Sequence, residues 1–445
     1  MAYWERVQVP PDFAGVTRAE REGGSYRRYH PDLLVGTSNV LEPAVAEFAA
    51  EVSTALAQLG GRLRATPLPI SYSTMIRSES ISSSWIEGIR ETPRAVALAQ
   101  IGDQAASHPA SQIVRNVNAM KEAIALLGAG AWEHEDIVRI HHDLLPWHPP
   151  GYRADQVWVG GTNKLNAEYV APPGEKVQHY MDDLLAYANT SGDLPVVQAA
   201  VINAQFETIH PFADGNGRVG RALVHGILKR SGLIDSGVIA LSTAFRNDER
   251  GYVEALTGYR YDGLERAPAL NVYLDRFLTY VETATASADR FVDGAVDIHR
   301  RWRTAVAGIR SDSSLHRAVD LVVENPVISA PFLAERLGVS GVSAQKLVRK
   351  LVAANIVAPA TGKYRRSALY QADDILALLA FGSEAGARTP GPGRFLRQDD
   401  AGSADDVGPT VVHRCGHPTP RGPCQNRVPV AAQQCWRHRD YLYQP

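Results

Sequence analysis

Apolar residues recur at helical spacing along most of this 445-residue chain. Between residues 42 and 60, Val45, Phe48, Val52 and Leu56 would lie on one face of a helix. Similar patterns recur at residues 111–127, 132–145, 194–209, 218–230 and 269–309. Strand-like alternation is sparse by comparison, so the sequence predicts a mainly α fold.

Composition and length narrow the class of protein. With 45% apolar and 21% charged residues, the chain is typical of globular proteins, and its length predicts several domains. A net charge of −2 excludes a globally basic nucleic-acid binder. Because no apolar run reaches the roughly 18 residues of a membrane span and the N-terminus lacks a signal-peptide pattern, we expect a cytoplasmic protein without membrane contact.

Changes in pattern predict five regions along the chain. They are an N-terminal helical region at 1–106, a helical core at 107–282, a connecting helix with a second helical module at 283–382, a flexible linker at 383–412 and a tail at 413–445. The linker is rich in Gly, Pro, Ser and Asp and poor in large apolar residues, as flexible segments are.

A polar, glycine-rich turn lies between His210 and Arg221, where one predicted helix ends and the next begins. Gly215 and Gly217 lack a Cβ atom, so successive backbone N–H groups can face one concavity beside the positive end of the second helix. Arg218 and Arg221, three residues apart, would lie on one helix face and could both reach a polyphosphate. The turn therefore has the features of an anion site.

The same turn also carries groups for catalysis. Asp214 offers a hard oxygen for Mg²⁺, which commonly bridges a carboxylate and phosphates. His210 can take a proton near neutral pH. The alternative is an ordinary helix–loop–helix in which Asp214 caps the second helix, but the gathering of all these groups within 12 residues favours a catalytic site.

This segment resembles the signature of the Fic family, HxFx(D/E)GNGRxxR, at every defined position. The resemblance implies an all-helical core with a small β-hairpin flap over the site. It further implies an enzyme that transfers AMP from ATP to a hydroxyl of a protein. By this resemblance, His210 is the base for a target Tyr, Ser or Thr, Asp214 holds Mg²⁺, and Phe212 anchors the loop in the core.

The resemblance also assigns the groups that bind the phosphates. The backbone of Gly215, Asn216 and Gly217 surrounds them, and the Asn216 side chain helps to orient them. Arg218 contacts the β- and γ-phosphates, and Arg221 contacts the γ-phosphate. If the nucleotide lay the other way round, the same histidine would drive phosphate transfer instead, so that alternative stays open.

Two short β-like runs around residues 157–171 resemble the Fic flap. Gly160 and Gly161 follow the first run, and Tyr169 and Val170 form the second. An edge hairpin can add a segment of a target protein as a further strand, which aligns a side chain without reading its sequence. We therefore expect an unidentified target protein to dock on the flap, the alternative being an ordinary surface hairpin.

Ser83, Glu87 and Gly88 fit the (S/T)xxxE(G/N) pattern of the Fic inhibitory helix. The resemblance implies a salt bridge from Glu87 to Arg221 that occupies the arginine needed by the γ-phosphate. The alternative is that Ser83 caps a helix and Glu87 pairs with any nearby basic residue. A self-inhibited helical core could be released by exchange between copies, so a homo-oligomer is a further expected state.

Residues 315–379 predict a winged helix, with helix–turn–helix elements at 330–337 and 343–354 and a two-stranded wing at 357–370. Between residues 300 and 370 the net charge is +8, a local basic region on an acidic protein. Duplex DNA, dimerisation and target docking are the open functions of this module. The residues that would contact DNA are Gln345, Lys346, Arg349, Lys350, Lys363, Arg365 and Arg366.

The tail holds every cysteine of the chain. Cys415, Cys424, Cys435 and His438 are four soft ligands within 24 residues, and a segment this short has no core of its own. They predict a structural Zn²⁺ site, the alternative being three free thiols. A rival to the enzyme is a DNA-binding transcriptional regulator whose Fic core senses nucleotide, but a pure sensor has no use for a base such as His210.

Overall fold

The computed structural model describes residues 1–12, 18–66, 70–102, 108–308, 313–360, 368–384, 413–414 and 427–428. The chain divides into two compact units, Met1–Phe395 and Leu396–Pro445. In the second unit, β8 (His413–Arg414) pairs antiparallel with β9 (Arg427–Val428). The four expected zinc ligands, Cys415, Cys424, Cys435 and His438, lie outside the described residues, and their site stays a prediction.

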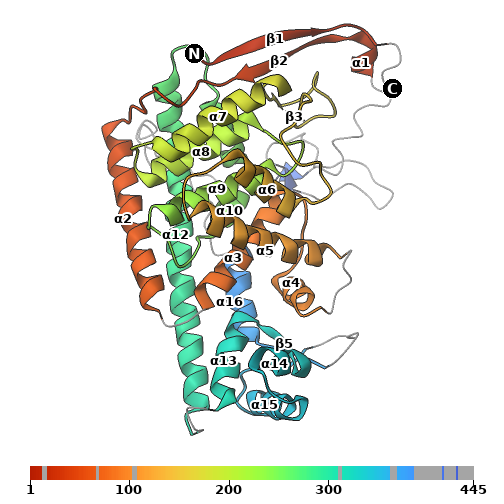
Figure 1. Ribbon diagram of the computed structural model, residues 1–445, viewed down its shortest axis with the longest axis vertical. Helices are drawn as coiled ribbons and strands as arrows, with labels where there is room; N and C mark the ends of the chain where they lie inside the picture. The colour runs from red at the N-terminus through yellow and green to blue at the C-terminus, as the bar shows by residue number, and fades with distance from the viewer. Residues whose placement is uncertain are drawn as a thin grey trace. The chain divides into compact units, whose positions relative to one another are not determined.

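The first unit is built mainly of helices, as expected (Figure 1). α8 (Pro195–Ile209) packs against α9 (Asn216–Arg230), and every residue of α8 from Val196 to Ile209 is buried. A helix buried on all sides is surrounded by other elements. The other helices between residues 43 and 259 are α2 (Pro43–Ala65), α3 (Ile70–Ile86), α4 (Pro93–Gln100), α5 (Pro109–Leu127), α6 (His134–Leu144), α7 (Gly174–Thr190), α10 (Leu241–Asn247) and α11 (Glu249–Tyr259). Of these, α2, α7 and α11 contact α8, and α3, α5 and α6 contact α9.

The chain begins with an antiparallel hairpin rather than with helices. β1 (Tyr3–Val9) pairs with β2 (Gly24–His30), and the short α1 (Arg18–Glu22) lies between them. This corrects the expected N-terminal helical region at 1–106, which apart from α1 is helical only from α2 onward. Both strands carry charged and aromatic side chains on partly exposed faces, so the sequence shows no clear apolar alternation there.

The predicted flap is present between α6 and α7. β3 (Trp158–Val159) pairs antiparallel with β4 (Tyr169–Val170), and Trp158 stands opposite Val170. β4 also contacts β2, so the N-terminal hairpin lies against the flap. The rings of Trp4 and Tyr169 meet edge to face across this contact.

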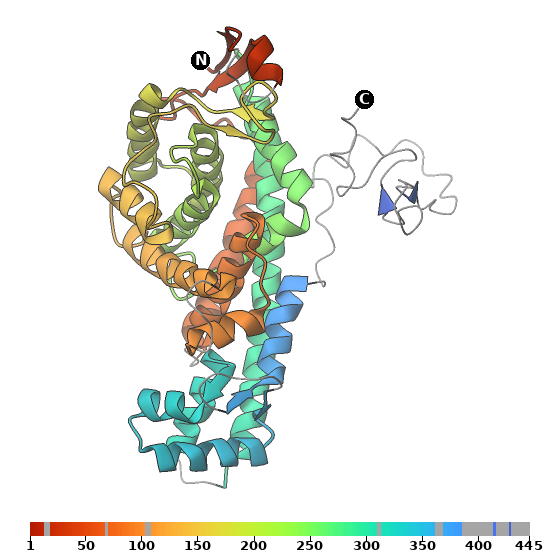
Figure 2. The ribbon, with the colours of Figure 1, turned by 90° about the vertical axis from the view of Figure 1, so that its right-hand side faces the viewer.

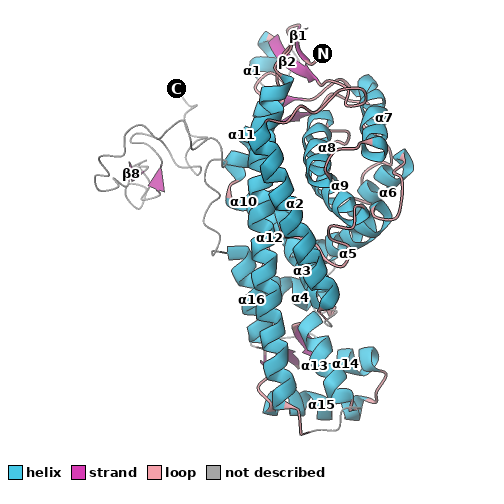
Figure 3. Ribbon diagram, turned by 90° about the vertical axis from the view of Figure 1, so that its left-hand side faces the viewer, coloured by secondary structure: helices cyan, strands magenta, loops and turns pink. Residues whose placement is uncertain are grey.

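α12 (Arg266–Ala305) is a single helix of 40 residues that runs beside α2 (Figure 3). Its residues up to Val292 pack into the core around α8, and those from Ala295 onward pack into a second core. The predicted boundary between residues 282 and 283 therefore falls inside a continuous helix. Neither α12 nor any other described helix is long and apolar enough to cross a membrane.

The second core contains the end of α12 and a module of short helices and strands (Figure 2). Its elements are α13 (Ser314–Glu324), β5 (Val327–Ser329), α14 (Ala330–Leu337), α15 (Gly341–Ala353), β6 (Ala358–Pro359), β7 (Leu369–Gln371) and α16 (Asp373–Glu384). The three strands form an antiparallel sheet in the order β5-β7-β6. We call residues 314–384 the C-terminal module. Residues 361–367, the tip of the expected wing, lie outside the described residues, and the winged-helix interpretation stays a prediction.

The turn between α14 and α15 follows from local sequence. Gly338 ends α14 with φ 65°, a left-handed conformation that glycine adopts readily. Ser340 then caps α15, because its hydroxyl accepts a hydrogen bond from the Ser343 N–H at 3.2 Å. The two helices therefore form a tight helix–turn–helix.

Candidate active site

The turn between α8 and α9 has an unusual backbone. His210 ends α8 with φ 51° and ψ 60°, a left-handed conformation that residues other than glycine rarely adopt. Gly215 caps α9 with φ 82°, and a Cβ there would lie 2.4 Å from Cδ1 of Leu145. Strained backbone of this kind persists where the surrounding structure holds it, and it concentrates at functional sites.

Asn216 holds this turn from the inside. Its Nδ2 donates to the carbonyl of Phe212 and its Oδ1 accepts from the Phe212 N–H, both at 2.9 Å. Because both ends of the amide are used, the side chain shapes the loop, and its expected part in orienting phosphates stays a prediction. The backbone N–H of Asn216, in the first turn of α9, remains suited to bind an anion.

Phe212 anchors the turn, as the resemblance implies. Its buried ring stacks on His141 of α6, with the ring centres 3.8 Å apart. The Nε2 of His141 donates to the carbonyl of Asp214 at 3.0 Å. Burial lowers the pKa of His141 to about 4, which keeps the ring neutral. α6 thus holds both the middle and the far end of the loop.

Arg153 is a residue whose role sequence reasoning missed. It is 8% exposed, and its guanidinium donates to the carbonyls of His210 (2.7 Å), Ile209 (3.1 Å), Pro172 (2.8 Å) and Asp155 (2.7 Å). It therefore joins the base of the flap to the strained end of α8. The Gly-Tyr-Arg run before the flap was the available signal, but a sequence does not reveal which carbonyls an arginine reaches.

His210 is a neutral ring with one nitrogen available. Its Nδ1 donates to the carbonyl of Glu207 at 3.3 Å, which leaves Nε2 as the unprotonated nitrogen. Burial is the main cause that lowers the pKa of His210 to about 4, and the positive charges of Arg260 and Arg153 lower it further. The ring is therefore unprotonated at neutral pH and able to accept a proton.

Glu207 is a second titratable group beside His210, and sequence reasoning missed it too. Its carboxyl lies 3.9 Å from Nδ1 of His210. Burial raises the pKa of Glu207 to about 7, the positive charge of Arg221 opposes this, and the negative charge of Glu87 adds to it. Glu207 thus titrates near neutral pH at the bottom of the site.

Asp214 points outward at the mouth of the turn. Its side chain is half exposed, with Oδ1 3.7 Å from Nη2 of Arg218 and Oδ2 3.7 Å from Nε2 of His148. No group of three or more His, Cys, Asp or Glu that could hold a metal occurs among the described residues. A single accessible carboxylate fits Mg²⁺ that takes its remaining ligands from phosphates and water.

Arg218 is a buried cation with unused donors. It is 3% exposed, and its Nε and Nη1 atoms have no hydrogen-bond partner among the described residues. Burial lowers the pKa of Arg218, while the charges of Glu87 and Asp214 raise it. Unsatisfied buried donors are costly, and an anionic phosphate beside the turn would satisfy them.

Arg221, in contrast, is fully engaged by the predicted inhibitory segment. Its Nη2 donates to Oε1 of Glu87 at 2.9 Å and to the carbonyl of Ser83 at 3.2 Å, and its Nε donates to the Ser83 hydroxyl at 2.8 Å. The Arg221 side chain is 1% exposed and that of Glu87 is 21% exposed. The pairing that the resemblance implies is therefore present, on a carboxylate that reaches solvent.

Two glycines flank this pairing, and one of them makes it sterically possible. A Cβ on Gly217 would lie 2.5 Å from Oε1 of Glu87 and 2.7 Å from Nη1 of Arg221. Gly88 has φ 84° and ends the helical turn that carries Glu87. The contact between Glu87 and Arg221 thus explains the glycine at position 217, and the left-handed backbone explains the glycine at position 88.

The flap glycines fix a tight loop between the two strands. Gly160 and Gly161 have φ 71° and 67°, and a Cβ on Gly161 would lie 2.4 Å from the carbonyl of Asn166. Tyr169 and Val170 are buried, and the Tyr169 hydroxyl donates to the Thr208 carbonyl at 2.5 Å. β3 is exposed and, among the described strands, pairs with β4 alone, which leaves its outer edge unpaired there.

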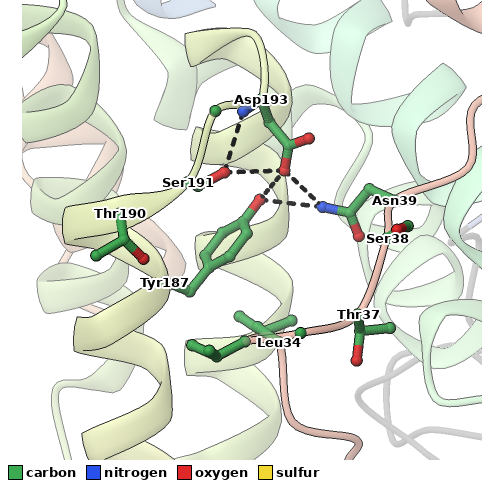
Figure 4. A pocket seen from close by; sticks show the side chains of 11 residues that line it. Leu34, Thr37, Ser38, Asn39, Tyr187, Thr190, Ser191 and Asp193 are labelled. Atoms are coloured by element: carbon green, nitrogen blue, oxygen red, sulfur yellow. Dashed lines mark hydrogen bonds between the residues drawn. The ribbon is translucent and has the colours of Figure 1, made fainter.

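A pocket away from the turn is held together by its own polar groups (Figure 4). Asp193 Oδ2 accepts hydrogen bonds from the Tyr187 hydroxyl (2.7 Å), Asn39 Nδ2 (2.7 Å) and the Ser191 hydroxyl (3.0 Å). These contacts fasten the loop after β2 to the end of α7. We assign this pocket a structural role.

Known protein families and proteins match the part of the chain that carries the candidate site. The Fic/DOC family model matches residues 131–228, and the model of the Fic/DOC family N-terminal region matches residues 47–125. A probable protein adenylyltransferase of Aquifex aeolicus is 37% identical over 109 residues, which are 24% of this chain and 30% of that protein. A protein adenylyltransferase of Caenorhabditis elegans is 31% identical over 105 residues, or 22% of this chain and 19% of that protein.

Among solved structures, a Fic family protein from Desulfovibrio desulfuricans aligns with 78% of this chain and 98% of that chain, at 19% identity and a TM-score of 0.45. That likeness is too weak to carry an argument on its own. The curated relatives match through less than a third of their length. Residues 131–228 thus carry a Fic/DOC domain, which includes the complete signature at His210–Arg221, and residues 47–125 match the N-terminal region of the same family.

Proposed function

We propose that this chain is a protein adenylyltransferase that moves AMP from ATP to a hydroxyl of a protein, and that Glu87 holds it inhibited. The observation that carries the proposal is the neutral His210, with Nε2 unprotonated, in the same turn as the buried, unsatisfied Arg218. Base and phosphate-binding donors are the two requirements of nucleotidyl transfer to a hydroxyl.

In the proposed reaction, the target hydroxyl oxygen attacks the α-phosphorus of ATP. The hydroxyl proton passes to Nε2 of His210, the bond from the α-phosphorus to the α,β-bridging oxygen breaks, and pyrophosphate leaves. Fixed donors that face the phosphates stabilise the charge that develops in the transition state. The first N–H groups of α9 and the guanidinium of Arg218 would supply them.

Mg²⁺ on Asp214, with phosphate oxygens as further ligands, would neutralise part of the pyrophosphate charge. Arg221 would bind the γ-phosphate once Glu87 leaves it. While Glu87 is paired, Arg221 would be unavailable to the γ-phosphate, and the α-phosphorus would not be aligned with His210. Inhibition would thus act on the geometry of bound ATP.

The target protein would dock on the open edge of β3. Trp158 and Val159 are 39% and 41% exposed there, while β4 is buried against the core. A strand added to β3 would place a side chain near His210 through main-chain hydrogen bonds. Arg153, which spans flap and turn, would hold this distance constant.

The test is labelling of protein by ATP that carries radioactive phosphorus at either the α or the γ position. We expect label from the α position in Glu87→Gly, little in the wild type, and none in Glu87→Gly/His210→Ala. Label from the γ position would instead establish phosphate transfer through the same site. Absence of label from either position, in folded Glu87→Gly supplied with candidate targets, would contradict the proposal.

A second function, binding of duplex DNA, is favoured by one observation on the C-terminal module. α15 exposes Gln345, Lys346, Arg349 and Lys350, and this helix contains no acidic residue. None of these cations makes an ion pair within the described part of the chain. A basic, unpaired face on the second helix of a helix–turn–helix suits the phosphates of a duplex.

The test is fluorescence anisotropy of a labelled duplex at several salt concentrations. Three phosphate contacts from α15 predict that the logarithm of the binding constant falls with the logarithm of the salt concentration with a slope of about −3. The triple variant Lys346→Ala/Arg349→Ala/Lys350→Ala should lose this slope, whereas Arg250→Ala, an exposed cation on α11, should not. Equal binding by both variants would contradict the assignment.

A further inference from the structure

The segment that inhibits the site is attached at both ends to the C-terminal module. α3 precedes Glu87, and α4 follows it after a short link. α3 contacts α13 and α16, and α4 contacts β5 and α16. The helix that presents Glu87 to Arg221 thus rests on elements more than 230 residues away in the chain, as the separation of Glu87 from Val327 shows.

The attachment of α3 is a buried arginine. Arg77 is 2% exposed, and its Nη2 donates to the backbone carbonyl of Glu324 at 2.9 Å. Glu324 is the last residue of α13, where the helix dipole favours a cation and the carbonyls lack helical partners. Burial lowers the pKa of Arg77 to about 10. Its Nε and Nη1 find no partner among the described residues.

The attachment of α4 combines one hydrogen bond with apolar contacts. Arg94 Nε donates to Oε1 of Gln371 on β7 at 2.8 Å. Ala97 and Leu98 form a small cluster with Val327 and Leu369, which stand on neighbouring strands of the module's sheet. This cluster joins α4 to the module, while Val96 on the same helix packs into the core around α8, and α4 also contacts α5 and α16.

The link between α3 and α4 is short and internally bonded. Trp85 Nε1 donates to the carbonyl of Glu91 at 3.1 Å, and the guanidinium of Arg246 lies over the Trp85 ring at 4.7 Å. These contacts limit the conformations of the link, so a shift of α4 or of the start of α3 would also displace Glu87. Energetic coupling between sites needs such a chain of packed contacts with alternative arrangements.

We propose that the C-terminal module sets the strength of inhibition, because it holds α3 and α4 in the position from which Glu87 reaches Arg221. The proposal rests on the proposed function and assigns its regulation. A partner that binds the module and shifts it from α4 would release the site, and one that tightens it would deepen inhibition. Arg77, Arg94 and Gln371 are positioning residues in this arrangement, and none of them touches substrate.

The test weakens the attachment and measures labelling from α-labelled ATP. Arg94→Ala removes the part-buried hydrogen bond to Gln371, and Gln371→Ala removes it together with the hydrogen bond that Gln371 Nε2 donates to Asp373. These losses are small, so each variant should fold, and we expect each to raise labelling about fivefold, the lower end of usual coupling. Arg77→Met should raise it more. In the Glu87→Gly background the same changes should have no effect, because no inhibitory contact remains to be weakened. Arg250→Ala is the matched control for loss of a surface arginine.

Hydrogen exchange at residues 83–92 supplies a second readout that needs no catalysis. We expect faster exchange there in Gln371→Ala and Arg94→Ala than in the wild type and in Arg250→Ala. Unchanged exchange and labelling in these variants, with active Glu87→Gly, would overturn the proposal. If Glu87→Gly itself carries no label, the proposed function fails instead, and the exchange measurement still tests the attachment.

Discussion

The catalytic turn and the inhibitory segment meet at Arg221, but they are held in opposite ways. The turn is fixed from several directions, by the Asn216 amide inside it, by His141 beneath it and by Arg153 across its start. The inhibitory segment reaches the site through one partly exposed carboxylate and one serine at the end of α3.

This difference shows that the inhibitory segment is easier to displace than the turn. Displacing the turn breaks many buried hydrogen bonds, whereas withdrawing Glu87 breaks one ion pair at its solvent-facing side. On the proposed function, activation would therefore move Glu87 and leave the turn that carries His210 and Arg218 in place.

The largest expected effect comes from loosening the fixed part. Arg153→Met in the Glu87→Gly background leaves the carbonyls of His210 and Pro172 without their donor. A small displacement of the base lowers rates strongly, so we expect labelling to fall about 100-fold. The measurement is the initial labelling rate, with circular dichroism as a check of folding. Arg139→Met, an exposed arginine on α6, should leave the rate unchanged.

The next effect comes from releasing the mobile part. A charge-assisted contact of about 2 kcal/mol between Glu87 and Arg221 corresponds to about 30-fold activation in Glu87→Gly. Glu87→Gln keeps a hydrogen-bond acceptor and loses the charge, so its activation should be smaller. Initial rates at saturating ATP give both values, and equal rates in all three proteins would refute the inhibitory role.

A smaller effect is expected inside the turn. Asn216→Ala leaves the buried N–H and carbonyl of Phe212 unpaired, which should lower the free energy of unfolding by about 1–3 kcal/mol. Urea denaturation measures the loss. Asn216→Asp keeps the acceptor for the N–H and should lose less, and if the two variants were equally stable, the reciprocal pair would not hold the turn.

Ser83 offers a milder release of the same arginine. Ser83→Ala removes the hydroxyl bonded to Arg221 Nε and keeps the Ser83 carbonyl, so one contact of about 1 kcal/mol is lost. We expect about fivefold faster labelling than in the wild type. No change would mean that Glu87 alone holds Arg221. Ser53→Ala, which removes a hydroxyl that donates to the Ala49 carbonyl within α2, is the matched control.

The smallest expected effect is the response of the base to pH. Because burial lowers the pKa of His210 from 6.5 to about 4, its ring is unprotonated from pH 6 to 8. The rate of Glu87→Gly should therefore show no loss from histidine protonation near pH 6.5 and should fall only as the pH approaches 4. An inflection near pH 7 that disappears in Glu207→Gln would belong to Glu207, whose pKa is about 7.

The sequence predicted the parts of the site that are local. The signature at His210–Arg221 lies on one helix–turn–helix. For the pattern at Ser83–Gly88, the family resemblance implied the pairing with Arg221 that the structure contains. Helical periodicity likewise located α2, α5, α6, α8 and α9 to within a few residues. These features depend on neighbours along the chain or on a long specific motif.

What the sequence did not predict depends on contacts between distant segments. The four carbonyls bonded to Arg153 come from two regions of the chain, and Arg77 reaches Glu324 across 247 positions. The N-terminal hairpin was missed because its strands lack apolar alternation, and their support comes from β4. The reciprocal bonds between the Asn216 side chain and Phe212 were not predicted, because a motif names a residue without showing what its side chain bonds.

The most direct measurement is the crystal structure of Glu87→Gly and of the wild type, each soaked with Mg²⁺ and an ATP analogue that has a methylene bridge between the α- and β-phosphates. We predict that in Glu87→Gly the γ-phosphate contacts Arg221 and the α-phosphorus faces Nε2 of His210. In the wild type, Glu87 should keep Arg221, and the phosphates should lie elsewhere. The same phosphate position in both proteins, with Glu87 still paired in the wild type, would contradict inhibition by Glu87.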